Sequence, residues 1–326
     1  MRYLVTGGAG FIGSHLATAL LDRGDEVLAL DDFSTGKERN LAAIKERAGF
    51  SLLAASILDE TTTGRAVADC DVVVHLAAAI GVKLIVEQPL ESMRTNIRGT
   101  EIVLDAAARD RRKVLFASTS EIYGRTLELM HEQADRVLGP TSVSRWSYSA
   151  AKAIGEHMAH AHARDDELPV VIARFFNTVG PRQTGAYAGV IPRLVTQALV
   201  GEDLTIYGDG TQTRCFCDVE DVVGAVLGLL DHEQAVGETF NIGSEHEVSV
   251  NELAETILEV SGSASRIVHV PFRDVFGHDF EDVPRRVPDT EKIRGLLGWQ
   301  PRIGLQEIVK RTIDHAHEVG PTRLLA

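Results

Sequence analysis

The stretch Gly7-Gly8-Ala9-Gly10-Phe11-Ile12-Gly13 decides the fold because of the segments on either side of it. A short apolar run at residues 3–6 leads into it and predicts a buried β-strand. Apolar residues then recur at helical spacing as far as Gly24, where the helix is expected to end. Residues 26–31 predict a second strand. This order of strand, glycine turn, helix and strand is typical of a dinucleotide-binding unit, in which the glycines let the backbone approach a pyrophosphate at a helix N-terminus.

An acidic residue at the end of the second strand indicates which dinucleotide binds. Asp31 stands 18 positions after Gly13 (31 − 13). Its carboxylate can accept hydrogen bonds from both ribose hydroxyls and would repel a 2′-phosphate, which favours NAD over NADP. Lys37 and Arg39 would favour NADP, but they follow Ser34-Thr35-Gly36 and are expected to be solvated.

The alternation of strands and helices continues through the first half of the chain. Strands are expected at residues 50–54, 71–76, 113–118 and 169–175, and long helices at 91–109 and 148–164. This pattern predicts an α/β fold with a doubly wound parallel sheet whose two faces are covered by helices. Ligands of such sheets bind at the carboxyl ends of the strands.

The pattern loosens after Phe176, which indicates a second domain. We expect residues 1–175 to form the NAD-binding domain, with 213–245 returning to it. Within that return, 215–219 and 239–242 are expected as strands and 221–230 as a helix. Residues 176–212 and 246–326 would form a smaller α/β substrate domain.

Composition limits the partners of the protein. The 326 residues carry a formal net charge of −14, which argues against nucleic acid or an anionic membrane as partner. No apolar run is long enough to span a bilayer, and no room for a signal peptide precedes the glycine stretch, so we expect a cytoplasmic protein. The three cysteines, Cys70, Cys215 and Cys217, have no neighbours that complete a metal site, and no metal is expected.

The stretch Tyr148-Ser-Ala-Ala-Lys152 indicates proton transfer. A spacing of four residues places the phenol and the ammonium on one face of a helix. The ammonium is expected to lower the pKa of Tyr148, so that the pair can remove a proton from an alcohol and return it.

Taken together, several motifs resemble an extended short-chain dehydrogenase/reductase that acts on nucleotide sugars. They are Thr6–Gly13, Asp31, His75–Ala78, Asn96, Thr119–Gly124, Tyr148–Lys152, Arg174–Arg182, Tyr207–Arg214 and Asn241–Gly243. The resemblance implies a Rossmann-type fold and NAD as cofactor. It also implies that Tyr148 is the base at the sugar C4 hydroxyl, that Lys152 holds the nicotinamide ribose, and that Thr119 bonds the same hydroxyl. Oxidation at C4 then yields a 4-keto sugar.

The same resemblance implies which residues bind the ligands. The cofactor contacts are expected at Gly7, Gly10, Phe11, Ile12, Gly13, Asp31, Asp32, Ser34, Thr35, Gly36, Ser56, Ile57, Leu76, Ala77, Ala78, Asn96, Tyr148 and Lys152. The contacts to a UDP-sugar substrate are expected at Asn177, Arg182, Val190, Arg193, Tyr207, Arg214 and Arg286. Ser56-Ile57 stands where many relatives have an Asp-Ile pair at the adenine, which weakens that contact.

Three local features favour decarboxylation of a uronic acid as the fate of the 4-keto sugar. Thr119-Ser120-Glu121 resembles the triplet of UDP-glucuronate decarboxylases, and Ser120 stands where a 4,6-dehydratase has an acid. Residues 145–149 and 280–288 resemble the decarboxylase domain of the bacterial lipid A aminoarabinose enzyme, and Arg286 falls on its active-site arginine. Glu121 and Arg286 are therefore expected to act in catalysis.

Three other interpretations stay open. The rest of the chain suits a UDP-sugar 4-epimerase equally well, and Glu121 would then be only a structural acid at a helix start. A 4,6-dehydratase is the second, although Ser120 stands where its acid is expected. A non-catalytic NAD-binding regulator on this fold is the third, although the complete set of Thr119, Tyr148 and Lys152 argues against it.

The resemblance also implies a homodimer. Relatives pair the helices at 91–109 and 148–164 across a two-fold axis, as a four-helix bundle. Ala106, Ala107, Ala153 and Met158 are the contact residues that we expect.

Overall fold

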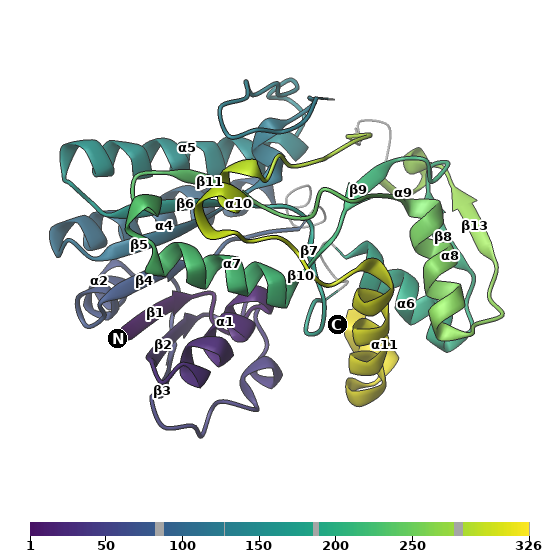
Figure 1. The fold of residues 1–326 in the computed structure, drawn as a ribbon, viewed down its shortest axis with the longest axis horizontal. Helices are drawn as coiled ribbons and strands as arrows, with labels where there is room; N and C mark the ends of the chain where they lie inside the picture. Colours follow the sequence, from purple (N-terminus) through teal and green to yellow (C-terminus); the bar gives the residue numbers. More distant parts are fainter. Residues whose placement is uncertain (82–87, 127, 185–188, 277–282, 326) are drawn as a thin grey trace.

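A parallel sheet with seven strands forms the larger part of the molecule (Figure 1). The structure is a computed structural model that describes residues 1–81, 88–126, 128–184, 189–276 and 283–325. The strand order is β11-β6-β5-β4-β1-β2-β3. The bounds are β1 (Arg2–Thr6), β2 (Glu26–Asp31), β3 (Phe50–Ala54), β4 (Val72–His75), β5 (Lys113–Thr119), β6 (Val170–Phe175) and β11 (Thr239–Ile242). The order reverses at β1, next to β4, so the predicted doubly wound, Rossmann-type sheet is confirmed.

Helices cover both faces of this sheet, as the alternation predicted. One face is covered by α1 (Phe11–Asp22) and α7 (Val219–Asp231). The other is covered by α2 (Glu60–Ala68), α4 (Pro89–Arg109) and α5 (Arg145–Asp165). Neighbouring strand residues point to opposite faces, so each face has its own apolar core and the central strands β1, β4, β5 and β6 are mainly apolar.

A smaller lobe lies beside the sheet and carries a separate core (Figure 1). Its parallel pair of strands is β8 (Leu204–Tyr207) and β13 (Ile267–Val270). Its helices are α6 (Val190–Val200), α8 (Val250–Ser261), α9 (Phe272–Phe276) and α11 (Leu305–Val319), whereas α10 (Glu291–Leu297) packs on β11. This core supports the proposed division into two domains. Among the described residues, no helix combines the length and the apolar character needed to cross a membrane.

The predicted return of the chain to the main sheet is only partly correct. β11 joins the sheet beside β6, as expected. The strand predicted at 215–219 is wrong, because β9 (Thr213–Cys215) pairs with β12 (Glu247–Ser249) and β10 (Cys217–Asp218) pairs with β7 (Thr178–Val179). The Asp218 carboxylate accepts a hydrogen bond from the Glu220 amide and starts α7 at Val219.

The expected dimer contacts are also wrong in part. Ala106, Ala107 and Ala153 are buried within the chain itself and have no surface left for a partner. Met158 is half-buried, and it packs against the core of the face that α4 and α5 cover. A sequence pattern of small residues on two long helices does not tell whether they face each other or a second copy, and here α4 packs directly against α5.

Gly13 lies where no other side chain fits. A Cβ atom added there would meet the carbonyl oxygen of Gly7 and would lie 2.9 Å from the Gly8 Cα. Because these are backbone atoms, we expect Gly13→Ala to lower the free energy of unfolding by about 1–3 kcal/mol and to weaken NAD binding. Gly64→Ala in α2 is the control, since nothing lies within 4 Å of its added Cβ. Unfolding in urea should show a loss for the first variant only, and equal stability of the two would contradict the tight contact.

Candidate active site

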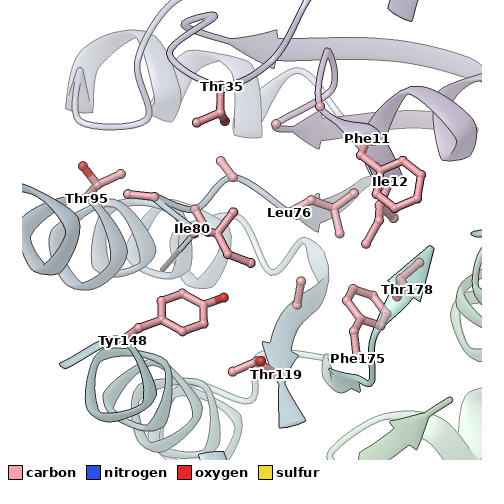
Figure 2. Close-up of a pocket in the computed structure, with 18 of the residues that line it drawn as sticks. Phe11, Ile12, Thr35, Leu76, Ile80, Thr95, Thr119, Tyr148, Phe175 and Thr178 are labelled. Atoms are coloured by element: carbon pink, nitrogen blue, oxygen red, sulfur yellow. The ribbon is translucent and has the colours of Figure 1, made fainter. Parts of the chain in front are cut away.

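A cavity of about 880 Å³ follows the carboxyl ends of the main strands toward the smaller lobe. Figure 2 shows side chains from several segments turned toward it, among them Phe11, Leu76 and Tyr148. Most of the predicted cofactor residues line it: Gly7, Gly10, Phe11, Ile12, Gly13, Asp31, Asp32, Ser34, Thr35, Ser56, Ile57, Leu76, Ala77, Ala78, Tyr148 and Lys152. The glycine stretch and the tyrosine–lysine helix, far apart in sequence, therefore face one space.

The Asp31 carboxylate holds the glycine loop in place. It accepts hydrogen bonds from the Ala9 amide at 2.9 Å and from the Phe33 amide at 2.8 Å. Burial raises the pKa of Asp31, although these amides oppose the rise. The carboxylate lines the cavity beside the N-terminus of α1, and this arrangement fits the adenosine ribose and the pyrophosphate of NAD.

We expect wild-type protein to bind NAD at least tenfold more tightly than NADP, because a 2′-phosphate would meet the charge of Asp31. Asp31→Ala should narrow this preference. The substitution should also weaken the binding of NAD, because two backbone amides lose their hydrogen-bond acceptor. Titration calorimetry with both dinucleotides measures the ratio. Equal affinity of the wild type for NAD and NADP would contradict this role of Asp31.

Two predicted cofactor residues lie behind the cavity wall. Asn96, buried in α4, accepts from the Ala79 amide at 2.9 Å and donates to the Ala79 carbonyl at 3.0 Å. Gly36 packs against the carboxylate of Asp31, where a Cβ would lie 2.6 Å from an oxygen. Both residues position parts of the wall, and the structure gives neither a place on its surface.

Tyr148 and Thr119 meet at the centre of the cavity. Tyr148 comes from α5 and Thr119 from the end of β5, and their side chains point toward the same space (Figure 2). The expectation that Lys152 lowers the pKa of Tyr148 is wrong for this structure. Burial raises that pKa, the charge of Glu121 raises it further, and the hydrogen bond with Thr119 only partly opposes the rise. Burial of the phenol is the largest cause of the shift, and Lys152 is not among the groups that act on this pKa.

Lys152 lies on the same helix as Tyr148, one turn later, and is held in place by its surroundings. Its ammonium donates to the Ala117 carbonyl at 2.8 Å and lies 4.9 Å from the centre of the Phe116 ring. Burial lowers its pKa to about 8, and the charge of Glu156 opposes the change. The ammonium is therefore still largely protonated at neutral pH, and Lys152 lines the cavity where a ribose hydroxyl could bind.

Arginines surround the carboxylate of Glu121. Arg286 lies 2.5 Å from one Glu121 oxygen, and Arg145 lies 3.7 Å from the other. Burial alone would raise the pKa of Glu121, but the charges of Arg286, Arg145 and Arg214 outweigh it, and the pKa lies below its usual value. Glu121 is thus ionised, and all four residues line the cavity. Arg145 was missed as a site residue, although it stands in the motif that precedes Tyr148.

The structure places some of the predicted substrate residues in the cavity, but not all of them. Asn177, Arg182, Val190, Arg214 and Arg286 line the cavity. Arg193 and Tyr207 do not line its described part. The Arg193 guanidinium lies 4.1 Å from the centre of the Tyr207 ring and donates to the Thr205 carbonyl, so these two residues pack on each other.

Other parts of the site add little chemistry. His75 is buried between the hydroxyls of Thr6 and Thr100, and burial lowers its pKa to about 3. It does not line the described cavity, so its role is in packing. Phe175 and Thr178 line the cavity and were not predicted.

No group of three His, Cys, Asp or Glu side chains in the described ranges could hold a metal ion. Residues 280–282 of the predicted arginine motif lie outside the described residues.

Comparison with known proteins gives a consistent group of relatives. The sequence model of the NAD dependent epimerase/dehydratase family matches residues 3–243. A UDP-N-acetyl-alpha-D-glucosaminuronate decarboxylase of Bacillus cytotoxicus is 44% identical over 98% of this chain and 98% of its own. The UDP-glucuronic acid decarboxylase 1 of Xenopus tropicalis is 34% identical over 96% of this chain and 72% of its own.

Solved structures show the same fold with other activities. The UDP-glucuronic acid 4-epimerase of Bacillus cereus, in complex with UDP-glucuronic acid and NAD, is 30% identical with a TM-score of 0.86, and the match covers 98% of this chain and 100% of that one. The UDP-glucose 4-epimerase of Thermotoga maritima is 32% identical with a TM-score of 0.87, over 98% of this chain and 99% of that one.

Proposed function

Because the chain belongs to the NAD-dependent epimerase/dehydratase family, we propose that it is a decarboxylase of UDP-hexuronates, which oxidises the sugar at C4 and then releases its carboxyl group as carbon dioxide. The observation that supports this reaction best is the group of arginines around Glu121. Three guanidinium groups act on a single carboxylate there. A group of guanidinium groups beside the predicted C4 site suits a substrate that brings a carboxylate as well as a diphosphate.

The first half of the proposed reaction uses Tyr148 and Thr119. When bound, NAD supplies the acceptor for the hydrogen at C4. Tyr148 takes the proton of the C4 hydroxyl. Thr119, whose hydroxyl is hydrogen-bonded to the Tyr148 phenol, holds the C4 oxygen in place. Lys152, fixed on the Ala117 carbonyl, holds the nicotinamide ribose.

The second half uses the ketone at C4. The electrons of the C5–C6 bond flow into an enolate, so carbon dioxide leaves without further oxidation. Thr119 and protonated Tyr148 stabilise the enolate oxygen. Arg286 binds the substrate carboxylate and offsets the repulsion from Glu121, which orients the sugar or manages the proton at C5.

The relatives name two substrates that differ at C2 of the sugar, a hydroxyl in one and an acetamido group in the other. We therefore propose UDP-hexuronates as the class. The test is an NMR screen of UDP-glucuronate, UDP-N-acetylglucosaminuronate, UDP-glucose and UDP-galactose with NAD. A pentose nucleotide from either uronate is the expected product. Interconversion of UDP-glucose and UDP-galactose would favour the second candidate, a 4-epimerase, as in the matching solved structures.

We also propose that the protein is a cytoplasmic homodimer that pairs through α4 and α5. Ile154 of α5 is 42% exposed, so this apolar side chain is available on the surface of the helix that the proposed dimer uses. We expect a dimer mass in light scattering at micromolar concentration, and a monomer mass for Ile154→Asp. Val268→Asp is the control, since Val268 is 37% exposed on β13 in the smaller lobe. A monomeric wild type would contradict the dimer.

A further inference from the structure

One turn of the chain reaches across the cavity to the helix that follows the glycine stretch. The turn, Gly180–Gln183, follows β7. His15 Nε2 of α1 lies 2.9 Å from the Pro181 carbonyl oxygen. Arg182 Nη1 donates to the Ser14 hydroxyl at 3.3 Å. Two residues of the turn are thus bound to the first turns of α1, more than 160 positions earlier in the chain.

The charge of Arg182 has no carboxylate partner among the described residues. Burial is the cause that lowers the pKa of Arg182, and no nearby acid opposes it. The hydroxyl of Ser14 is a weak, neutral acceptor for a guanidinium with five N–H donors. A partly buried cation without an anion is costly in free energy, so this site favours a bound anion.

The backbone of Arg182 is strained as well. Its φ angle is 68°, in the left-handed region that side chains other than glycine seldom adopt. Such strain persists where the surrounding contacts determine the conformation, and it is frequent at ligand sites. The Arg182 side chain contacts α1 through Ser14, whereas Arg286, Arg145 and Arg214 are the arginines that act on Glu121.

We propose that Arg182 binds the pyrophosphate of NAD, and not the diphosphate of the substrate as the sequence suggested. Ser14 lies in the helix whose N-terminus, at Gly10–Gly13, receives the pyrophosphate in this kind of fold. The planar guanidinium can add two parallel hydrogen bonds to a phosphate. The turn then covers the cofactor, and the substrate diphosphate is left to Asn177 and Arg214. The inference rests on the use of NAD by the family and not on decarboxylation.

The test is titration calorimetry of Arg182→Met, Arg182→Lys and wild type, freed of bound nucleotide, with NAD, ADP-ribose, adenosine and UDP. Arg182→Met should weaken NAD and ADP-ribose by a similar factor, about tenfold to a hundredfold, because both contain the pyrophosphate. Adenosine and UDP should bind as to wild type. Arg182→Lys keeps the charge, so its affinity for NAD and ADP-ribose should lie between those of wild type and Arg182→Met. Arg164→Met, at an exposed site near the end of α5, is the matched control and should change nothing.

Three results would overturn the proposal. Weaker binding of UDP together with unchanged binding of NAD would show that Arg182 contacts the substrate diphosphate and not the cofactor. Unchanged binding of all four ligands would reduce the Ser14 contact to a structural one. An equal loss for adenosine and NAD, with a lower melting temperature, would indicate a distorted loop. None of these results depends on which reaction the enzyme performs, because no UDP-sugar is present.

Discussion

Tyr148→Phe is expected to lower turnover by a hundredfold or more while the fold and the NAD affinity stay unchanged. The variant keeps the ring that is buried in the cavity wall and removes only the hydroxyl that bonds to Thr119. General acid–base groups contribute about 10²–10⁴ in rate. Single-turnover measurement of nicotinamide reduction, at 340 nm, reports this step directly.

Tyr3→Phe is a matched control for this experiment. Tyr3 is buried in β1, its hydroxyl accepts a hydrogen bond from Arg23, and it does not line the cavity. Both variants lose one phenolic hydroxyl, but only the first loses the proposed base. Near-normal turnover of Tyr148→Phe, or an equal loss in the control, would contradict the role of Tyr148.

Arg286→Ala is expected to reduce carbon dioxide release from a UDP-hexuronate by about a hundredfold, with NAD affinity within threefold of wild type. The guanidinium is 7% exposed and paired with Glu121 at 2.5 Å. Its removal leaves the Glu121 carboxylate to repel the carboxylate of the substrate, and takes away the group that holds it. Glu121→Gln should also reduce release, because it removes the charge that orients Arg286.

Arg285→Ala separates this effect from a general loss of charge. Arg285 is the neighbour of Arg286 in sequence, but its side chain turns to Glu247 on β12, at 2.6 Å, and does not line the cavity. Carbon dioxide release should therefore stay near that of wild type. If Arg286→Ala and Glu121→Gln weaken NAD as much as they slow release, the pair is structural and the proposed role is wrong.

The main sheet could be predicted because each of its strands and helices has a recognisable pattern in its own stretch of sequence. Each strand is an apolar run between turn residues, and α1 follows the glycine stretch directly. The strand at 215–219 failed for the opposite reason. β9 and β10 are only three and two residues long, and partners far away in the chain determine them. Residues 215–219, four of them apolar, do not show in sequence which members pair, nor that Asp218 caps a helix instead.

The motifs predicted which residues line the cavity, but they did not predict where the long side chains among them point. Arg182, Arg193 and Arg286 all stood as substrate contacts in the sequence, and the structure turns them to Ser14, Tyr207 and Glu121. Which way a long side chain points depends on the tertiary partners that surround it. The pKa of Tyr148 is a second example, since spacing places Lys152 nearby but does not show how deeply both groups are buried.

The fate of the substrate carboxyl group tests the central proposal most directly. UDP-glucuronate and UDP-N-acetylglucosaminuronate, labelled with ¹³C at the carboxyl carbon, would each be incubated with wild-type protein and NAD and followed by NMR. We expect the label of at least one of them to leave the nucleotide sugar as carbon dioxide and bicarbonate, with an unlabelled pentose nucleotide as product. Retention of the label in a C4 epimer would contradict decarboxylation and identify the protein as an epimerase.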